Sequence, residues 1–127
     1  MRMYADTVYY FNEYDGSIIA EEELEKALKK ASRHIDTLTY NRIVGKGFYN
    51  LTKFQQSIIK EVCCTLADFE TENAELINSM LKSYSINGVS MTLGSSWNVS
   101  VESGVAIRSD LYERLQQTGL CCRSLGV

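Results

Sequence analysis

The residues best suited to nucleophilic, redox or metal chemistry in this chain are four cysteines and one histidine. The cysteines form two adjacent pairs, Cys63-Cys64 and Cys121-Cys122, and the histidine is His34. Adjacent cysteines rarely provide the geometry of a disulfide, and zinc sites usually space their cysteines further apart. Reduced cysteines are often buried as small apolar residues. We therefore expect four reduced thiols, with no metal and no cofactor.

A catalytic site would need a nucleophile beside a base, and Cys63 with His34 is one such combination. A thiolate nucleophile requires an electropositive, partly exposed setting. Cys63 instead falls beside the apolar stripe of a predicted helix, and His34 is expected at a helix surface or boundary. Gly45-Lys46-Gly47 lacks the G-x-x-x-x-G-K-[ST] spacing that holds phosphates. We expect no catalytic residue and no enzyme activity, with a thiol-dependent enzyme as an alternative.

Two long amphipathic helices are predicted to position the core. From about Ala20 to Leu38, and again from Thr52 to about Thr71, apolar residues recur at three- and four-residue intervals, which places them on one helix face. Thr52 with Gln55 forms a capping box at the start of the second helix. The expected core residues are Leu24, Leu28, Ala31, Ile35 and Leu38 in the first helix, and Phe54, Ile58, Ile59, Val62, Cys63, Leu66 and Phe69 in the second.

Shorter helices surround these two. An N-terminal helix within Tyr4 to Tyr14, capped by Asp6 or Thr7, is expected to end before Asp15-Gly16. A glycine-containing loop is expected at 45–47, and a short helix from Ala74 to Leu81. The last helix is expected from Ser109 to Thr118, with Ser109 as its cap, Leu111 and Leu115 facing inward, and Gly119 at its end.

Between these last helices the apolar residues follow the period of β-structure. Asn87-Gly88 is the usual signal of a tight hairpin turn. Apolar residues alternate with small polar ones on both sides of it: Tyr84, Ile86, Val89, Met91 and Leu93. We predict a β-hairpin at about 83–93 and an exposed, mobile loop from Gly94 to Gly104. The fold class is therefore mainly α: a small bundle of two long antiparallel helices plus shorter N- and C-terminal helices, with one β-hairpin or long loop.

The hairpin and the tryptophan after it are candidates for a binding surface. Two strands alone are marginally stable, and their open edges pair readily with another chain. Aromatic residues are enriched in protein interfaces, and the chain has eight tyrosines and one tryptophan. The candidate partner-binding residues here are Tyr84, Ile86, Val89, Met91 and Trp97. The alternative is that these side chains complete a small core.

Charge and hydropathy exclude several functional classes. The net charge of −3 argues against nonspecific nucleic-acid binding, which usually needs a basic face. A small helical DNA-binding regulator is the alternative that a helix-turn-helix within the bundle would allow. No apolar run approaches the roughly 20 residues of a membrane span, and the N-terminus lacks the pattern of a signal peptide. We expect synthesis in the cytosol and no membrane partner.

Four short phrases give the sequence a family resemblance. They are Ala31-Ser32-x-x-Ile35-Asp36-x-Leu38-Thr39, Leu51-Thr52-x-Phe54-Gln55, Tyr84-Ser85-Ile86-x-x-Val89-Ser90 and Thr118-Gly119-Leu120-x-x-Arg123. In this order and spacing, the chain resembles the small head–tail connector, or adaptor, proteins of tailed bacteriophages and prophages. It departs from the family pattern at Ala20, where a proline is usual, and at Cys121-Cys122, where the tail is usually aromatic.

The resemblance implies a structural virion protein. Such proteins form a ring, commonly of twelve subunits, beneath the portal at the capsid vertex. The ring extends the DNA channel toward a tail-side connector or stopper protein. The implied partners are other copies of the chain, the portal and the stopper, while genomic DNA passes through without sequence-specific binding. The implied location is the head–tail interface of the virion, and the host cytoplasm during assembly.

The resemblance also implies roles for two groups of residues. Residues 1–119 would form the connector domain, and the tail 120–127 would dock on the portal through Leu120, Arg123, Leu125 and Val127. The alternative is that the tail packs on its own helices. Acidic residues near the end of the second long helix would line the channel and repel the DNA backbone: Glu61, Asp68, Glu70, Glu72 and Glu75. Ordinary solvation of a charged helix face is the alternative there.

Overall fold

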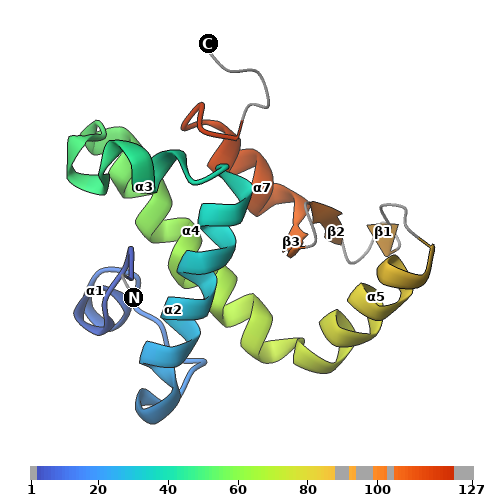
Figure 1. Ribbon diagram of the computed structural model, residues 1–127. Helices are drawn as coiled ribbons and strands as arrows, with labels where there is room; N and C mark the ends of the chain where they lie inside the picture. The colour runs from blue at the N-terminus through green and yellow to red at the C-terminus, as the bar shows by residue number, and fades with distance from the viewer. Residues whose placement is uncertain (1–2, 88–91, 94–98, 103–104, 122–127) are drawn as a thin grey trace.

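The computed structural model describes residues 3–87, 92–93, 99–102 and 105–121. Within them the chain is a small, mainly helical bundle, as predicted (Figure 1). The helices are α1 (Thr7–Asn12), α2 (Glu21–Leu38), α3 (Arg42–Lys46), the 3-10 turn η1 (Phe48–Asn50), α4 (Lys53–Glu72), α5 (Ala74–Asn87) and α7 (Ser109–Gln116). The strands are β1 (Thr92–Leu93), β2 (Val99–Glu102) and β3 (Val105–Arg108), which pair antiparallel in that order.

Helices α2 and α4 form the centre of the bundle and run in opposite directions (Figure 1). Helix α1 lies beside them, α7 packs against α4, and the strands lie between α7 and α5. The predicted apolar stripes are buried on both central helices, which confirms the two-helix core. The buried members are Leu24, Leu28, Ala31, Ile35 and Leu38 on α2, and Ile58, Ile59, Val62, Cys63, Leu66 and Phe69 on α4.

Local signals fix where the helices begin. The Asp6 side chain accepts a hydrogen bond from the Tyr9 amide and caps α1, as predicted. The capping box at the start of α4 is also confirmed, because Thr52 and Gln55 each accept a hydrogen bond from the other's backbone amide. On α2, Lys29 Nζ lies 2.9 Å from a carboxylate oxygen of Glu25, four residues earlier, and such pairs stabilise an exposed helix face.

The predicted hairpin at 83–93 is wrong in its first half, because Ser83 to Asn87 form the last part of α5. Ile77, Leu81 and Tyr84 also follow the three- to four-residue spacing of a helix. A short apolar run does not distinguish this helical spacing from the two-residue alternation of a strand. A glycine after asparagine suits the end of a helix as well as a tight turn. Residues 88–91 lie outside the described residues.

The antiparallel pairing lies later in the chain than expected. Strand β2 occupies part of the stretch predicted as a mobile loop, and Val99 within it is fully buried. The alternating β-branched residues Val99, Val101, Val105 and Ile107 favour strands over this range. The rest of the predicted loop, 94–98 and 103–104, lies outside the described residues.

Three smaller predictions also need correction. Ser109 is the first helical residue of α7 and not its cap, which is Arg108. Gly45 and Lys46 belong to α3, and only Gly47, with φ of 88°, leaves the helical conformation. Phe54 lies in the first turn of α4, where its face is not covered, and its side chain is 57% exposed. The expected inward positions of Leu111 and Leu115 are confirmed.

Candidate functional site

Four large apolar side chains are exposed along the segment that joins α2 to α4 and in the first turn of α4. We call these residues the turn patch: Tyr40, Val44, Tyr49 and Phe54. Tyr49 is the most exposed of them at 84%, and Phe54 follows the turn directly at the start of α4. Aromatic side chains that remain this exposed in a subunit are typical of protein interfaces. Tyr49 lies outside the periodic apolar stripes, so residue spacing does not predict its exposure.

A second set of exposed apolar side chains lies on the N-terminal part of the chain. We call it the α1 patch: Val8 and Phe11 on α1, and Ile18 in the loop after it. These side chains are between 40% and 62% exposed. Their helix neighbour Tyr10 is fully buried, so α1 presents one apolar face to the core and another to solvent.

The predicted partner-binding residues are only partly placed by the structure. Tyr84 and Ile86 lie in α5. Leu120 is 6% exposed, and its carbonyl oxygen accepts a hydrogen bond from Arg42 Nη1 at 3.1 Å. The prediction that the tail leaves the bundle at Leu120 is therefore wrong, because apolar burial and this bond hold its first residue on the subunit. Val89, Met91, Trp97, Arg123, Leu125 and Val127 lie outside the described residues.

The five predicted channel-lining acids do not share one face. Glu61, Glu72 and Glu75 are exposed, and Glu61 pairs with Arg114 of α7 at 3.3 Å. Asp68 and Glu70 are only 5% and 8% exposed. The channel-lining prediction is wrong for these two, because α4 is covered on several sides near its end and both carboxyl groups bind side chains of other elements.

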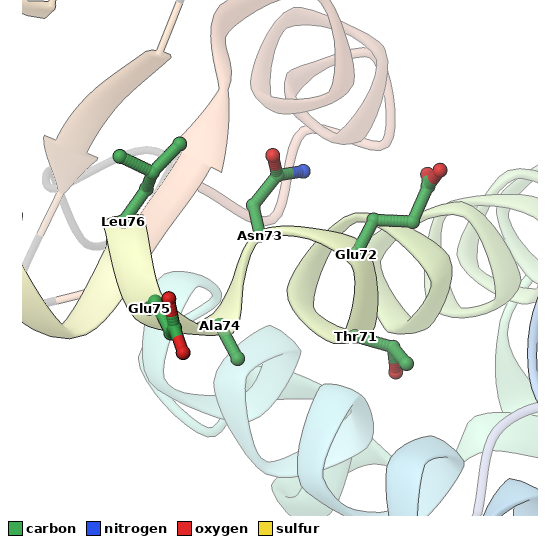
Figure 2. Close-up of a pocket in the computed structure, with 6 residues that line it drawn as sticks. All are labelled: Thr71, Glu72, Asn73, Ala74, Glu75 and Leu76. Carbon is green, nitrogen blue, oxygen red and sulfur yellow. The ribbon is translucent and has the colours of Figure 1, made fainter.

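The residues around the α4–α5 junction form a shallow hollow of about 450 Å³. It is lined by Thr71, Glu72, Asn73, Ala74, Glu75 and Leu76. Figure 2 shows Glu72 and Asn73 on one side of the ribbon, and Thr71, Ala74 and Glu75 on the other. The exposed acids Glu72 and Glu75 therefore point to opposite sides of the junction.

Asp68 joins α4 to the N-terminal segment through two tyrosine hydroxyls. Tyr10 donates to Asp68 Oδ1 at 2.6 Å, and Tyr14 donates to Asp68 Oδ2 at 3.0 Å. The Tyr10 hydroxyl in turn accepts hydrogen bonds from the amides of Ile18 and Ile19. A Cβ on Gly16 would lie 2.2 Å from the Tyr10 ring, so only glycine permits this loop to close over the ring.

Both phenols of this network hold their protons more tightly than ordinary tyrosines. Burial raises the pKa of Tyr14 to about 12, although a hydrogen bond with Thr65 acts in the opposite direction. Burial also raises the pKa of Tyr10, and the hydrogen bond to Asp68 adds to this effect. The Tyr10 and Tyr14 hydroxyls therefore stay protonated and donate to Asp68 over the ordinary pH range.

We expect the free energy of unfolding to fall as the pH rises from 10 to about 12. Below the ordinary tyrosine pKa both folded and unfolded chains keep the phenol protons, so the stabilisation is present in full. Above it the unfolded chain loses protons that Tyr10 and Tyr14 retain in the folded chain, which favours unfolding. Urea unfolding followed by circular dichroism at a series of alkaline pH values measures the slope.

The variant Tyr14→Phe should reduce this alkaline slope, because one of the two protected phenols is gone. Tyr49→Phe is the matched control, since Tyr49 is an exposed tyrosine outside the network. An unchanged slope in Tyr14→Phe would contradict the assignment.

His34 and Glu70 meet at the edge of a second cavity. His34 Nδ1 and Glu70 Oε2 form a hydrogen bond between α2 and α4. The His34 side chain is 30% exposed, which agrees with the boundary position expected from the sequence. The other carboxyl oxygen, Glu70 Oε1, is buried and has no hydrogen-bond partner among the described residues.

The cysteines of the described residues are buried free thiols. Cys63 and Cys64 are fully buried on α4, and Cys121 is 6% exposed. Cys63 Sγ contacts Ser32 Oγ at 3.4 Å and donates to the carbonyl of Leu28, and the structure does not bring it to His34. Burial raises the pKa of Cys63 and Cys64, and raises that of Cys121 to about 11. This environment disfavours a thiolate nucleophile.

We expect Cys63, Cys64 and Cys121 to resist alkylation by iodoacetamide in the folded protein at mildly alkaline pH. Burial blocks access, and the raised pKa values leave little thiolate to react. Peptide mapping by mass spectrometry, with and without urea, measures the modification at each cysteine. Alkylation of Cys63 in the folded protein at the rate seen in urea would contradict the buried-thiol assignment.

Comparisons with protein-family models, curated proteins and solved structures find no match. Among the described residues, no group of three or more His, Cys, Asp or Glu side chains is placed to hold a metal ion. None of the helices in the described part of the chain combines the length and apolar character that a bilayer crossing needs.

Proposed function

We propose that this protein is a structural subunit of a tailed-bacteriophage head–tail connector. In this proposal, copies of the chain form a ring between the portal and the tail-side connector or stopper protein. The ring extends the DNA channel at the capsid vertex, and the genome passes through it without sequence-specific binding. In this proposal the protein functions in the virion, after the particle has assembled in the host cytoplasm.

The observation that carries the proposal is the pair of exposed apolar patches on different segments of one small subunit. The turn patch lies between α2 and α4, and the α1 patch lies near the N-terminus. A subunit that binds its neighbours through two different surfaces forms a heterologous contact, and such contacts give a ring when the rotation from one subunit to the next closes. Exposed aromatic side chains on two separate segments, Phe11 on α1 and Tyr49 before α4, suit a subunit with two neighbours.

Two further features support the proposal. The helical-bundle fold is the one that the sequence resemblance implies. The resembling phrases begin in the second half of α2, just before α4, in the last part of α5 and just after α7. The net charge of −3 suits a protein that DNA passes without sticking.

Native mass spectrometry of the purified protein tests the proposal, alone over a range of concentrations and mixed with the portal encoded nearest to it. We expect a monomer or weak oligomer alone and a ring on the portal. The double variant Tyr49→Ser with Phe54→Ser should melt like the parent but fail to form the ring. Leu76→Ser is the matched control, because it removes an exposed apolar side chain on α5 outside both patches.

A tight dimer that never joins a portal complex would overturn the connector proposal. If the Tyr49 and Phe54 double variant forms the ring at the same concentrations as the parent, the turn patch is not part of the interface between subunits. Salt-dependent binding of the purified protein to duplex DNA would instead favour a DNA-binding regulator.

A further inference from the structure

Glu70 presents a carboxyl oxygen that the folded chain does not satisfy. Glu70 is 8% exposed, and its Oε2 binds His34 while its Oε1 has no partner among the described residues. A buried polar atom without a hydrogen bond is costly, so such atoms are usually satisfied by something. Glu70 Oε1 therefore marks a place for a donor that the described chain does not supply.

The space for that donor is the cavity beside α2, α4, α5 and β3. It has a volume of about 120 Å³, and at about 30 Å³ for each water-sized group it holds roughly four such groups. Its polar lining is Lys30, His34, Glu70 and Asn78, and its apolar lining is Ala74, Ile77, Val105 and Ala106. A ligand that fits must pair a polar head with a short apolar stem.

The polar lining selects for a compact hydrogen-bond donor. When His34 Nδ1 donates to Glu70, the other ring nitrogen is an acceptor, and the Asn78 side chain has an acceptor oxygen as well. Glu70 Oε1 adds a third acceptor. A primary ammonium has three donors on one nitrogen, so it can donate to Glu70 Oε1 and still have donors for another polar group of the lining.

Other ligand classes fit less well. A guanidinium binds best to both oxygens of a carboxylate, but Glu70 Oε2 is already bound to His34. An anion would meet the Glu70 carboxyl group in a buried setting. A metal ion would lack ligands, because no group of three metal-binding side chains occurs among the described residues.

We propose that this cavity binds a primary alkylammonium group. The nitrogen donates to Glu70 Oε1, and the methylene stem lies against Ala74, Ile77 and the β3 residues. Lys30 is exposed and forms no ion pair with a described residue, so its flexible stem leaves it free to turn toward solvent when a cation enters. The group belongs either to a free small amine or to a lysine side chain of another protein chain. This proposal does not depend on the connector function.

The test is a titration of the full-length protein with n-butylammonium, followed by NMR of the His34 ring and the Val105 and Ala106 methyl groups. We expect saturable binding. The control ligand is butyltrimethylammonium, which carries the charge but has no N–H donor and should bind at least about tenfold more weakly, as the loss of a charged hydrogen bond predicts. The variant Lys30→Met should bind n-butylammonium more tightly, because it removes a like charge from the cavity wall.

Two variants test the binding site itself, and each is checked to be folded before binding is measured. Glu70→Gln should weaken binding by at least about tenfold through loss of the charged acceptor. Ala74→Leu fills the rim of the cavity from an exposed position, without touching Glu70 or His34, and should also weaken binding. Thermal melting of each variant confirms that it is folded before the titration.

A second arm distinguishes the two sources of the ammonium group. If n-butylammonium disperses an assembly of the protein in sedimentation velocity, and Glu70→Gln does the same, the natural ligand is a lysine of another copy. If assembly is unaffected while n-butylammonium still binds, the ligand is a free amine. No saturable binding, or equal binding by Glu70→Gln or by butyltrimethylammonium, would show that only water satisfies Glu70 Oε1, and would overturn the proposal.

Discussion

Replacing Phe69 by alanine is expected to lower the free energy of unfolding by about 3–5 kcal/mol. Phe69 lies in the second half of α4, the central helix of the bundle, and is only 4% exposed. The substitution removes buried apolar surface and leaves a cavity that the surrounding helices fill only in part. Since small domains have a total stability of about 5–15 kcal/mol, the loss should be a large fraction of the whole.

The chain provides a matched control on the same helix. Phe54 is also a phenylalanine of α4, but its side chain is 57% exposed, so Phe54→Ala should change stability by no more than about 0.5 kcal/mol. Urea unfolding of the two variants and the parent measures the difference. Equal losses in the two variants would mean that α4 is packed with a different face inward.

The long helices were predictable from the sequence because independent signals agree on each of them. On α4 the capping box at Thr52 and Gln55 marks the start, and the apolar period marks the buried face. On α2 the acidic residues of the first turn complement the helix dipole and mark the start. The Glu25–Lys29 pair, four residues apart, marks the exposed face. Each signal depends on neighbours within a few residues, so no knowledge of the tertiary fold was needed.

The region after α5 could not be predicted in the same way, because its signals are short and ambiguous. Ser83 to Asn87 have an apolar alternation that fits a strand and also fit the continuation of a helix. Strand β2 pairs with β3, and β3 contacts α2 and α5, which lie far earlier in the chain. Burial of this kind is determined by the tertiary fold, so the neighbouring residues in the sequence carry little signal of it.

The acidic residues near the end of α4 show a similar limit for the candidate site. In the sequence, Glu61, Asp68, Glu70, Glu72 and Glu75 form one charged group. In the structure, Asp68 and Glu70 are buried because Tyr10, Tyr14 and His34, all from earlier segments, supply their partners. Partners that lie 36 to 58 residues away in the chain cannot be paired by spacing alone. The boundary position of His34 was predicted, but its bond to Glu70 was not.

Replacing Asp68 by alanine is expected to lower the free energy of unfolding by about 2–5 kcal/mol. The buried Tyr10 hydroxyl and the partly buried Tyr14 hydroxyl each lose an acceptor, at about 1–3 kcal/mol for a fully buried group. The side chain of Asp68 is 5% exposed, and it joins the hydroxyls of both Tyr10 and Tyr14 to α4. Without it, the N-terminal segment should loosen first. Hydrogen exchange should therefore show faster exchange of the α1 amides than of the α4 amides.

The control variants separate the lost bonds from the lost charge. Asp68→Asn keeps an acceptor for Tyr10 but turns a donor toward Tyr14, so its loss of stability should be smaller than that of Asp68→Ala. In a double-mutant cycle, Asp68→Ala and Tyr14→Phe should be less than additive, with a coupling of about 0.5–3 kcal/mol, because they remove the same bond. Additive losses would mean that Asp68 and Tyr14 do not interact in solution. Unsatisfied buried hydroxyls are costly, so a loss below about 1 kcal/mol for Asp68→Ala would mean that water reaches both hydroxyls. In that case apolar packing alone would hold α1 on the bundle.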